Sequence, residues 1–284
     1  MKVTALVENT RLENGQDLSA EWGLSLHIRH DGTQILFDTG ATEAFGHNAE
    51  RLGVDIREVD VVVVSHHHYD HGGGLAHFLE TNSKAKVYLR RNEAGDPRFR
   101  AFFGIVNRYV GLDRGVLKKN ADRFEFVDEF AEIRPDVFIL TQIGNRYPPP
   151  KGNRHLYVEE GGTRELDRFE HELIMVLRDK EGLVVVTGCA HRGILNMVDA
   201  VSSQFQGVPI KAVFGGFHLV GGLPVLNTMA GSRREVEGIG EEMLKYPIKK
   251  VYTGHCTGPK AYRVLKGVMG DKLEYLPTGA SVEV

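Results

Sequence analysis

Cysteine is scarce in this sequence, which has two, Cys189 and Cys256, among 284 residues. Both lie in glycine-flanked segments that also contain histidines, a context typical of free thiols or metal chemistry rather than of a disulfide scaffold. An iron–sulfur cluster normally needs about four cysteine ligands, so the two cysteines exclude an iron–sulfur domain as well. We therefore expect a reducing compartment and a cytoplasmic protein.

The sequence also lacks long apolar runs and an excess of one charge. No stretch approaches the roughly 20 apolar residues of a membrane helix, and the apolar run before Glu8 is too short for a signal peptide. The net charge is -3, so nothing indicates a basic surface for nucleic acid or anionic lipid. We expect a small-molecule substrate and neither a nucleic-acid nor a membrane partner. The composition leaves a homo-oligomer open.

The size and apolar content predict one domain over residues 1–284, because a chain of this length with 42% hydrophobic residues can bury a sizeable core. The segment at about 91–168 is the hardest to interpret. It mixes aromatic and charged residues and contains the breaker Tyr147-Pro148-Pro149-Pro150-Lys151-Gly152. We interpret this segment as an insertion that shapes a pocket.

Hydrophobic patterns predict the order of strands and helices. Runs at 24–29 and 34–37 flank an Asp31-Gly32 turn, which indicates a hairpin, and the β-branched run Val59 to Val64 is typical of a fully buried strand. From residue 173 onward, strands alternate with helices. The expected strands are 173–177, 183–187, 210–214 and 249–252, and the expected helices are 194–205, 233–245 and 260–268. This order predicts a layered α/β arrangement with functional groups at strand ends.

A cluster of potential metal ligands follows the Val-rich strand directly. His66, His68, Asp70 and His71 fall within six positions, where the backbone must turn and side chains can converge. Imidazole nitrogens and one carboxylate suit zinc, iron, manganese or cobalt. The alternative, an exposed histidine-rich turn, is disfavoured by the buried strand before the cluster and the glycines after it. His67 alternates with the ligands and is expected to point away.

Three further histidines each come just after a predicted strand. His191, His218 and His255 all lie in glycine-rich segments, where glycine permits close approach of backbones. A single histidine at a strand end is more often structural, but the repeated context indicates a shared site. We rank His255 first as an additional ligand, then His191, then His218.

The motif His-x-His-x-Asp-His after a hydrophobic strand, with Phe37-Asp38-Thr39-Gly40 upstream and Gly254-His255 downstream, resembles the metallo-β-lactamase superfamily. The resemblance spans the whole chain and implies the four-layer αββα metallo-β-lactamase sandwich of the α/β class (α+β in some schemes). It implies that His66 and His68 hold one metal and that Asp70, His71 and His255 hold a second. It further implies that Asp38 orients a ligand, although an ordinary turn aspartate is the alternative.

Two family features differ in this sequence. No Pro-Gly-His is evident near residues 169–173, and Cys189 follows the strand after which a bridging aspartate is usual. A Cys189 thiolate could be a ligand, His191 could replace both missing contributions, or Cys189 could be a small packed thiol. Segments such as Glu21-Trp22-Gly23, Gly188-Cys189-Ala190-His191 and Gly254-His255-Cys256 are similar to a narrower subgroup, the dihydropterin-linked ribofuranosylaminobenzene 5'-phosphate synthase-like proteins.

These features predict a metal-dependent hydrolase or transferase for a small, phosphorylated or pterin-like substrate. One or two divalent metals, zinc first and iron or manganese as alternatives, would activate water or polarise a phosphoryl oxygen. We expect Asp70 to help hold the water and His218 to donate a proton to the leaving group. Arg192 and Lys260 are candidates for receiving a substrate phosphate. The alternatives are a di-iron redox or electron-transfer protein on the same fold and a non-catalytic metal-binding protein.

Overall fold

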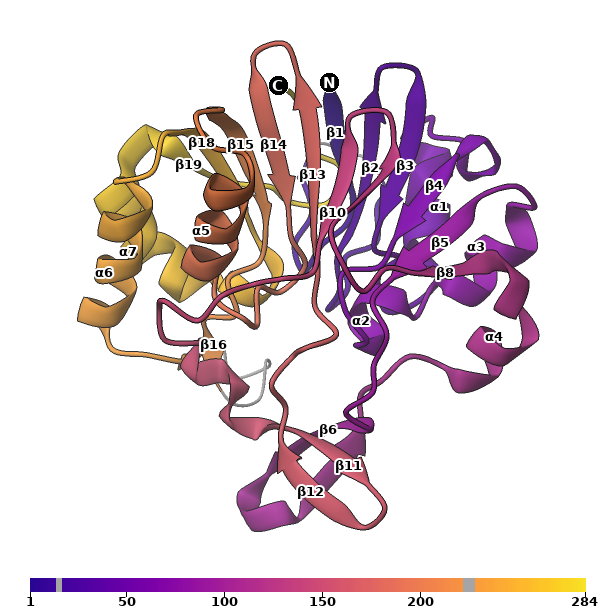
Figure 1. The fold of residues 1–284 in the computed structure, drawn as a ribbon, viewed down its shortest axis with the longest axis horizontal. Helices are drawn as coiled ribbons and strands as arrows, with labels where there is room; N and C mark the ends of the chain where they lie inside the picture. Colours follow the sequence, from indigo (N-terminus) through magenta and orange to yellow (C-terminus); the bar gives the residue numbers. More distant parts are fainter. Residues whose placement is uncertain (14–16, 222–227) are drawn as a thin grey trace. The chain divides into compact units, whose positions relative to one another are not determined.

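The computed structural model describes residues 1–13, 17–221 and 228–284, which form two compact units (Figure 1). Unit 1 comprises Met1–Arg91, Val110–Asp128 and Leu276–Val284, and unit 2 comprises Asn92–Tyr109 and Glu129–Tyr275. Each unit contains a seven-stranded sheet of its own. No helix among the described residues is both long and apolar enough to span a membrane.

The sheet of unit 1 has the strand order β20-β1-β2-β3-β4-β5-β8. Its strands are β1 (Lys2–Val7), β2 (Ser25–His30), β3 (Thr33–Phe37), β4 (Val61–Val63), β5 (Lys86–Leu89), β8 (Phe124–Phe126) and β20 (Ser281–Glu283). The predicted hairpin is confirmed, because β2 and β3 pair antiparallel around a turn in which Asp31 and Gly32 both have positive φ. β4 pairs parallel with both β3 and β5, as expected for a strand buried on both faces.

Helices α1 (Ala44–Arg51), α3 (Leu75–Thr81) and α4 (Arg114–Lys119) also belong to unit 1, with the single turn α2 (Tyr69–Gly72) after β4. Phe45 of α1 and Phe78 of α3 join Val62 and Val87 in one buried apolar cluster. The helices therefore cover a face of this sheet through a shared core. Short 3-10 turns η1 (Ile56–Glu58) and η3 (Ala121–Arg123) complete the unit.

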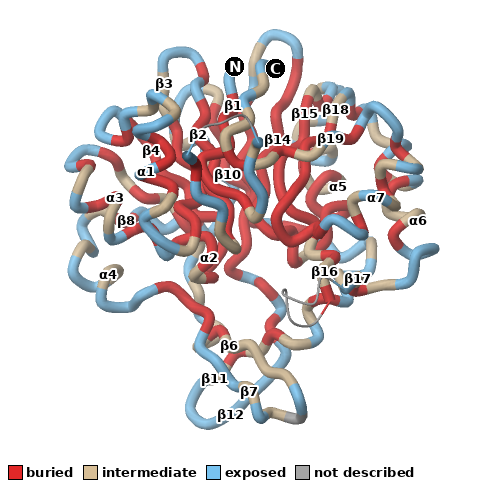
Figure 2. Tube along the Cα trace, turned by 180° about the vertical axis from the view of Figure 1, so that it is seen from behind, coloured by how far each residue is buried: buried red, intermediate tan, exposed pale blue. Residues whose placement is uncertain are grey.

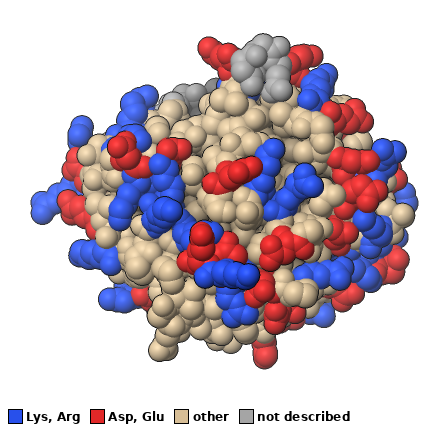
Figure 3. Space-filling model, turned by 90° about the horizontal axis from the view of Figure 1, so that it is seen from above, with Lys and Arg blue, Asp and Glu red and all other residues tan. Residues whose placement is uncertain are grey.

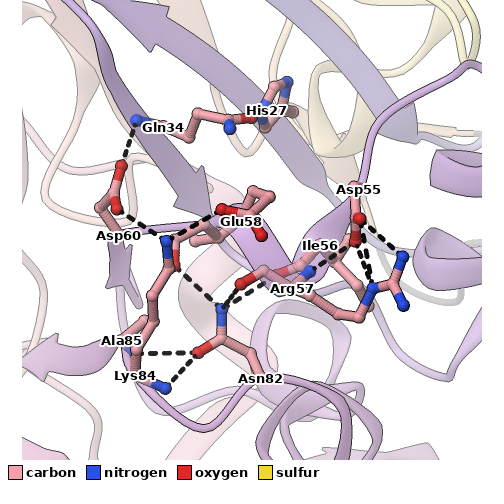
Figure 4. A network of polar contacts seen from close by, with 11 residues as sticks. His27, Gln34, Asp55, Ile56, Arg57, Glu58, Asp60, Asn82, Lys84 and Ala85 are labelled. Carbon is pink, nitrogen blue, oxygen red and sulfur yellow. Dashed lines mark hydrogen bonds and ion pairs between the residues drawn. The ribbon is translucent and has the colours of Figure 1, made fainter.

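The buried side chain of Asn82 fixes the connections on either side of β4 (Figure 4). Its amide nitrogen donates hydrogen bonds to the carbonyls of Ile56 and Val59, at 3.0 and 2.9 Å. Its carbonyl oxygen accepts from the backbone N–H groups of Lys84 and Ala85, at 3.0 and 2.8 Å. One residue thus ties the turn after α3 to the segment that enters β4, the strand that leads to the histidine cluster.

The sheet of unit 2 has the strand order β19-β18-β15-β14-β13-β10-β9. Its strands are β9 (Ala131–Arg134), β10 (Val137–Leu140), β13 (Ile174–Asp179), β14 (Gly182–Val186), β15 (Ile210–Gly215), β18 (Ile248–Thr253) and β19 (Leu273–Tyr275). β14, β15, β18 and β19 are parallel to one another, so the ends of these strands lie along one edge of the sheet. β13, β14 and β15 are buried along most of their length (Figure 2).

Three helices of unit 2 share its apolar core. They are α5 (Ile194–Gln204), α6 (Arg233–Met243) and α7 (Pro259–Met269), and their buried residues pack with those of the sheet. The strands and helices predicted after residue 173 are confirmed. Other short elements are η4 (Lys151–His155), η6 (His255–Thr257), η7 (Gly270–Lys272) and the strand pair β16 (Val220–Gly221) and β17 (Thr228–Met229).

The segment at 91–168 contributes to both units. In unit 2 it forms a separate antiparallel sheet of order β12-β11-β6-β7, and it also supplies β9 and β10. The strands of this small sheet are β6 (Asp96–Ala101), β7 (Val106–Tyr109), β11 (Leu156–Glu160) and β12 (Thr163–Leu166), with η2 (Phe102–Gly104) between β6 and β7. Residues 110–128, with α4 and β8, belong to unit 1.

Acidic and basic side chains are interspersed on the face of the molecule in Figure 3.

Candidate metal centre

In unit 1, the predicted ligands His66, His68, Asp70 and His71 are all buried at the end of β4. The chain bends at His66 and His67, is extended at His68, the residue before α2, and then makes one helical turn that carries Asp70 and His71. Nε2 of His66 lies 3.1 Å from Nδ1 of His68, and the rings of His66 and His71 have centroids 4.3 Å apart. Nε2 of His71 lies 3.9 Å from a carboxylate oxygen of Asp70. A bend followed by one helical turn thus gathers the four side chains.

His67 lies outside this cluster. Its Nε2 is 2.7 Å from the carbonyl oxygen of Arg90 and donates a hydrogen bond to it. The ring therefore points away from its histidine neighbours, as the sequence predicts.

Asp38 orients the cluster from the end of β3. Its buried carboxylate accepts hydrogen bonds from the Ser65 backbone N–H at 2.7 Å and the Ser65 hydroxyl at 2.8 Å. The same carboxylate lies 2.6 Å from Nδ1 of His71. Because a carboxylate can only accept, Nδ1 of His71 carries the proton and Nε2 is left with its lone pair. Asp38 has a left-handed φ of 58°, a strained conformation that is typical of functional sites.

Ser65 extends this arrangement to His66 and is a functional residue that the sequence analysis missed. Its hydroxyl donates to Asp38 and lies 2.8 Å from Nδ1 of His66, from which it accepts. Two histidines are therefore held in the tautomer that presents Nε2. The only sequence signal was its position directly between the strand and the first histidine.

The donor set of unit 1 fits a first-row divalent cation. Buried imidazoles and a carboxylate in contact are the ligand types that zinc, iron and manganese accept. Two nitrogens bound to one tetrahedral zinc ion would lie roughly 3.3 Å apart, given bonds of about 2.0–2.1 Å. The 3.1 Å between His66 Nε2 and His68 Nδ1 agrees with that value.

In unit 2, His191 is buried in the loop between β14 and α5, and contacts from three sides hold its ring. Nδ1 lies 3.0 Å from the side-chain oxygen of Asn153, and the ring stacks on Phe169 at a centroid distance of 4.1 Å and an interplanar angle of 3°. The His218 ring lies on it at a centroid distance of 4.1 Å. Asn153 and Phe169 were not identified from the sequence, because they are 38 and 22 positions before His191.

Glu172 is a further residue that the sequence analysis missed. Its fully buried carboxylate accepts the backbone N–H groups of His191 and Arg192, both at 2.8 Å. Burial raises the pKa of Glu172 to about 8, although the two N–H donors oppose the rise. Two ionisable residues, His171 and Glu172, directly before an apolar strand were the available signal.

Two other loops of unit 2 carry His218, His255 and Cys256. His255 and both cysteines are buried, and the two cysteines do not form a disulfide. The His218 backbone N–H donates to the Cys256 sulfur at 3.3 Å. Burial raises the pKa of the Cys256 thiol, but a hydrogen bond with Cys189 and the nearby His255 and His218 together hold it well below its usual value. Ala190, His218 and His255 all have left-handed φ, one in each loop.

The two residues predicted to receive a phosphate differ in position. Arg192 lines a cavity of about 650 Å³ together with His191, Phe169 and residues from 144–154 and 166–170. Its guanidinium donates to the carbonyl of Ile143, which holds the side chain in place. Lys260 lies exposed in the first turn of α7 and is not among the residues that line this cavity.

Comparison with known proteins identifies similar sequences. A family model described as the metallo-beta-lactamase superfamily matches residues 23–255. The chain is 30% identical over 279 residues to the 7,8-dihydropterin-6-methyl-4-(beta-D-ribofuranosyl)-aminobenzene-5'-phosphate synthase of Methanocaldococcus jannaschii, a match that covers 93% of this chain and 90% of the relative.

Solved structures lead to the same family. A metal-dependent hydrolase of the β-lactamase superfamily has 33% identity and a TM-score of 0.82, with 100% of this chain and 99% of that chain covered. Zn²⁺-bound PqqB from Methylobacterium extorquens is 10% identical with a TM-score of 0.56, covers 100% of both chains and shows a likeness of fold alone. The expected metallo-β-lactamase fold, with mixed sheets and helices, is therefore confirmed. This chain belongs to the metallo-β-lactamase superfamily.

Proposed function

We propose that this protein is a metal-dependent hydrolase or transferase that acts on a small phosphorylated or pterin-like substrate. The observation that carries the proposal is the buried cluster of His66, His68, Asp70 and His71, in which Asp38 and Ser65 set the tautomers. These four residues would hold one or two divalent cations. His191 and His255 are proposed as further ligands, and Cys189 as a candidate ligand, because the family resemblance implies ligands from these loops.

A bound divalent cation would lower the pKa of a water molecule or polarise a phosphoryl or acyl oxygen. The residues of the chain would hold the reactants in place. Asp70, whose carboxylate is beside Nε2 of His71, would accept a hydrogen bond from the attacking water. Asp38, by accepting from His71 Nδ1, would keep the opposite nitrogen directed at the cation. The role of His218 as a proton donor stays a prediction.

The cavity beside His191 supports a phosphorylated, ring-containing substrate. Its volume of about 650 Å³ lies within the usual range for small-molecule sites. Arg154, Arg168 and Arg192 are among its lining residues and offer guanidinium groups to a phosphate. Tyr147 and Phe169 also line it and would contact a planar ring. The name of the Methanocaldococcus relative, a synthase of a ribofuranosylaminobenzene 5'-phosphate, agrees with this class of substrate.

Metal analysis of a His66→Ala, His71→Ala double variant tests the proposal. We expect it to lose both bound metal and activity on phosphodiester, lactone or thioester model substrates. His67→Ala is the matched control, since this neighbouring ring is directed at the Arg90 carbonyl, and it should keep its metal. Full metal occupancy in the double variant would refute the assignment.

The wild-type protein, purified without chelator, separates the alternatives. Turnover of a model substrate that is lost with the metal supports the hydrolase or transferase. Bound iron with a reversible change in visible absorption on reduction would contradict it in favour of a redox protein. An intact metal centre without activity on any substrate class would favour a metal-binding protein without catalysis.

A further inference from the structure

Two cysteines and a histidine meet within unit 2. Cys189 follows β14, His218 follows β15 and Cys256 follows β18. The two sulfurs and a ring nitrogen of His218 all lie within 4.8 Å of one another. Because β14, β15 and β18 are neighbouring parallel strands, the three loops emerge side by side at one sheet edge.

His218 has a ring nitrogen, Nδ1, that is buried and makes no hydrogen bond with the residues that the structure describes. Burying such a group without a partner costs about 1–3 kcal/mol, so a ligand there would remove a real penalty. Gly152 leaves room for the ring in this position, because a Cβ at residue 152 would lie 2.7 Å from Cδ2 and 3.0 Å from Nε2 of His218.

The backbone is also adapted to the Cys256 sulfur. A Cβ at residue 216 would lie 2.4 Å from this sulfur, so only glycine leaves room for it. The N–H of His218 donates to the same sulfur at 3.3 Å. Hydrogen bonds of this kind support metal-bound thiolates. His218 itself has a φ of 49°, a conformation disfavoured for a non-glycine residue that here directs both its N–H and its ring toward the thiols.

We propose that Cys189, Cys256 and His218 bind a thiophilic divalent cation of the zinc type, with a fourth position open to water or substrate. Zinc with bonds of about 2.3 Å to sulfur and 2.0 Å to nitrogen places its ligands roughly 3.5–3.8 Å apart. Ligand atoms within 4.8 Å reach that geometry by small side-chain rotations. Two thiolates favour zinc over magnesium or manganese. In this assignment His218 is a metal ligand instead of a proton donor.

Cobalt substitution tests this site directly, because Co²⁺ bound by thiolates has a sulfur-to-metal charge-transfer absorption in the near ultraviolet. The chain has two cysteines, so the band reports on Cys189 and Cys256 and no others. With reduced, Co²⁺-loaded full-length protein, we expect Cys256→Ser to lose about half of the band. We expect His218→Ala to weaken the cobalt affinity, measured by titration of the band, at least tenfold. His155→Ala, which changes another histidine of unit 2, should leave this affinity unchanged.

An unchanged band in Cys256→Ser would overturn the proposal, because Cys189 alone would then account for it. A His218→Ala variant with wild-type affinity at the band would overturn it as well. Circular dichroism and thermal melting of each variant separate loss of a ligand from loss of the fold. The measurement is repeated in the His66→Ala, His71→Ala background. There the band should persist although activity is lost, so failure of this site and failure of the proposed function are distinguishable.

Discussion

The histidine turn of unit 1 and the three loops of unit 2 are built in opposite ways. Residues 65–71 hold the candidate ligands within one short segment, and a bend followed by one helical turn is enough to bring the side chains together. In unit 2 the polar residues come from loops after β14, β15 and β18, and each loop contains one non-glycine residue with left-handed φ. The side chains of the histidine turn need neighbouring residues to orient their rings. The side chains on the three loops of unit 2 also need the loop backbones to be held in place.

The largest effect should come from removing the orienting carboxylate of unit 1. Asp38→Ala leaves the donors of Ser65 and His71 without their buried acceptor. We expect a loss of about 3–5 kcal/mol in the free energy of unfolding and of roughly 10–100-fold in metal affinity. Urea denaturation and competition with a chelator measure the two quantities.

Asp38→Asn sharpens this test because it keeps an oxygen acceptor but removes the negative charge. It should bind metal with an affinity between those of the wild type and Asp38→Ala. Equal metal affinity of all three proteins would show that the histidine rings do not need Asp38 to orient them. The two units would then differ only in how their backbones are held.

Glu172→Ala is the corresponding change in unit 2. It removes the acceptor for the N–H groups of His191 and Arg192 and leaves both buried or half-buried without a partner. We expect a loss of about 2–4 kcal/mol in the free energy of unfolding. Increased amide hydrogen exchange at residues 189–193 should accompany it, because the carboxylate holds the backbone of this loop and not a ligand ring.

Glu172→Gln is the matched control, since its side-chain oxygen can still accept one of the two N–H groups. It should lie between the wild type and Glu172→Ala in both measurements. Unchanged exchange in Glu172→Ala would contradict the view that unit 2 depends on a held backbone.

This contrast also explains which features were predictable. The cluster at 66–71, the Asp31-Gly32 hairpin and the strand and helix order after residue 173 are written in short local patterns, and the structure places all of them as expected. The supports of His191 were not predictable. Asn153 and Phe169 reach it from distant segments, and Glu172 contacts backbone N–H groups, which leave no trace in side-chain patterns. Sequence therefore identified the candidate ligands more readily than the residues that hold them.

The smallest expected effect is a pH dependence in the sheet of unit 1, away from the histidine turn. His27 on β2 lies largely buried with its Nε2 3.1 Å from the side-chain oxygen of Gln34 (Figure 4). Burial lowers the pKa of His27 below 6.5, and the hydrogen bond with Gln34 opposes this only in part. The folded state therefore prefers neutral His27, and its contribution to stability is present above about pH 6.5 and lost as pH falls through the folded-state pKa.

His27→Gln removes this titration and keeps an amide that can bond to Gln34. We expect the free energy of unfolding to fall less steeply between about pH 7 and pH 5 in this variant than in the wild type, because one proton fewer is taken up on unfolding. Urea denaturation at several pH values measures the two slopes. Identical slopes would mean that the burial of His27 does not contribute to the acid sensitivity of unit 1.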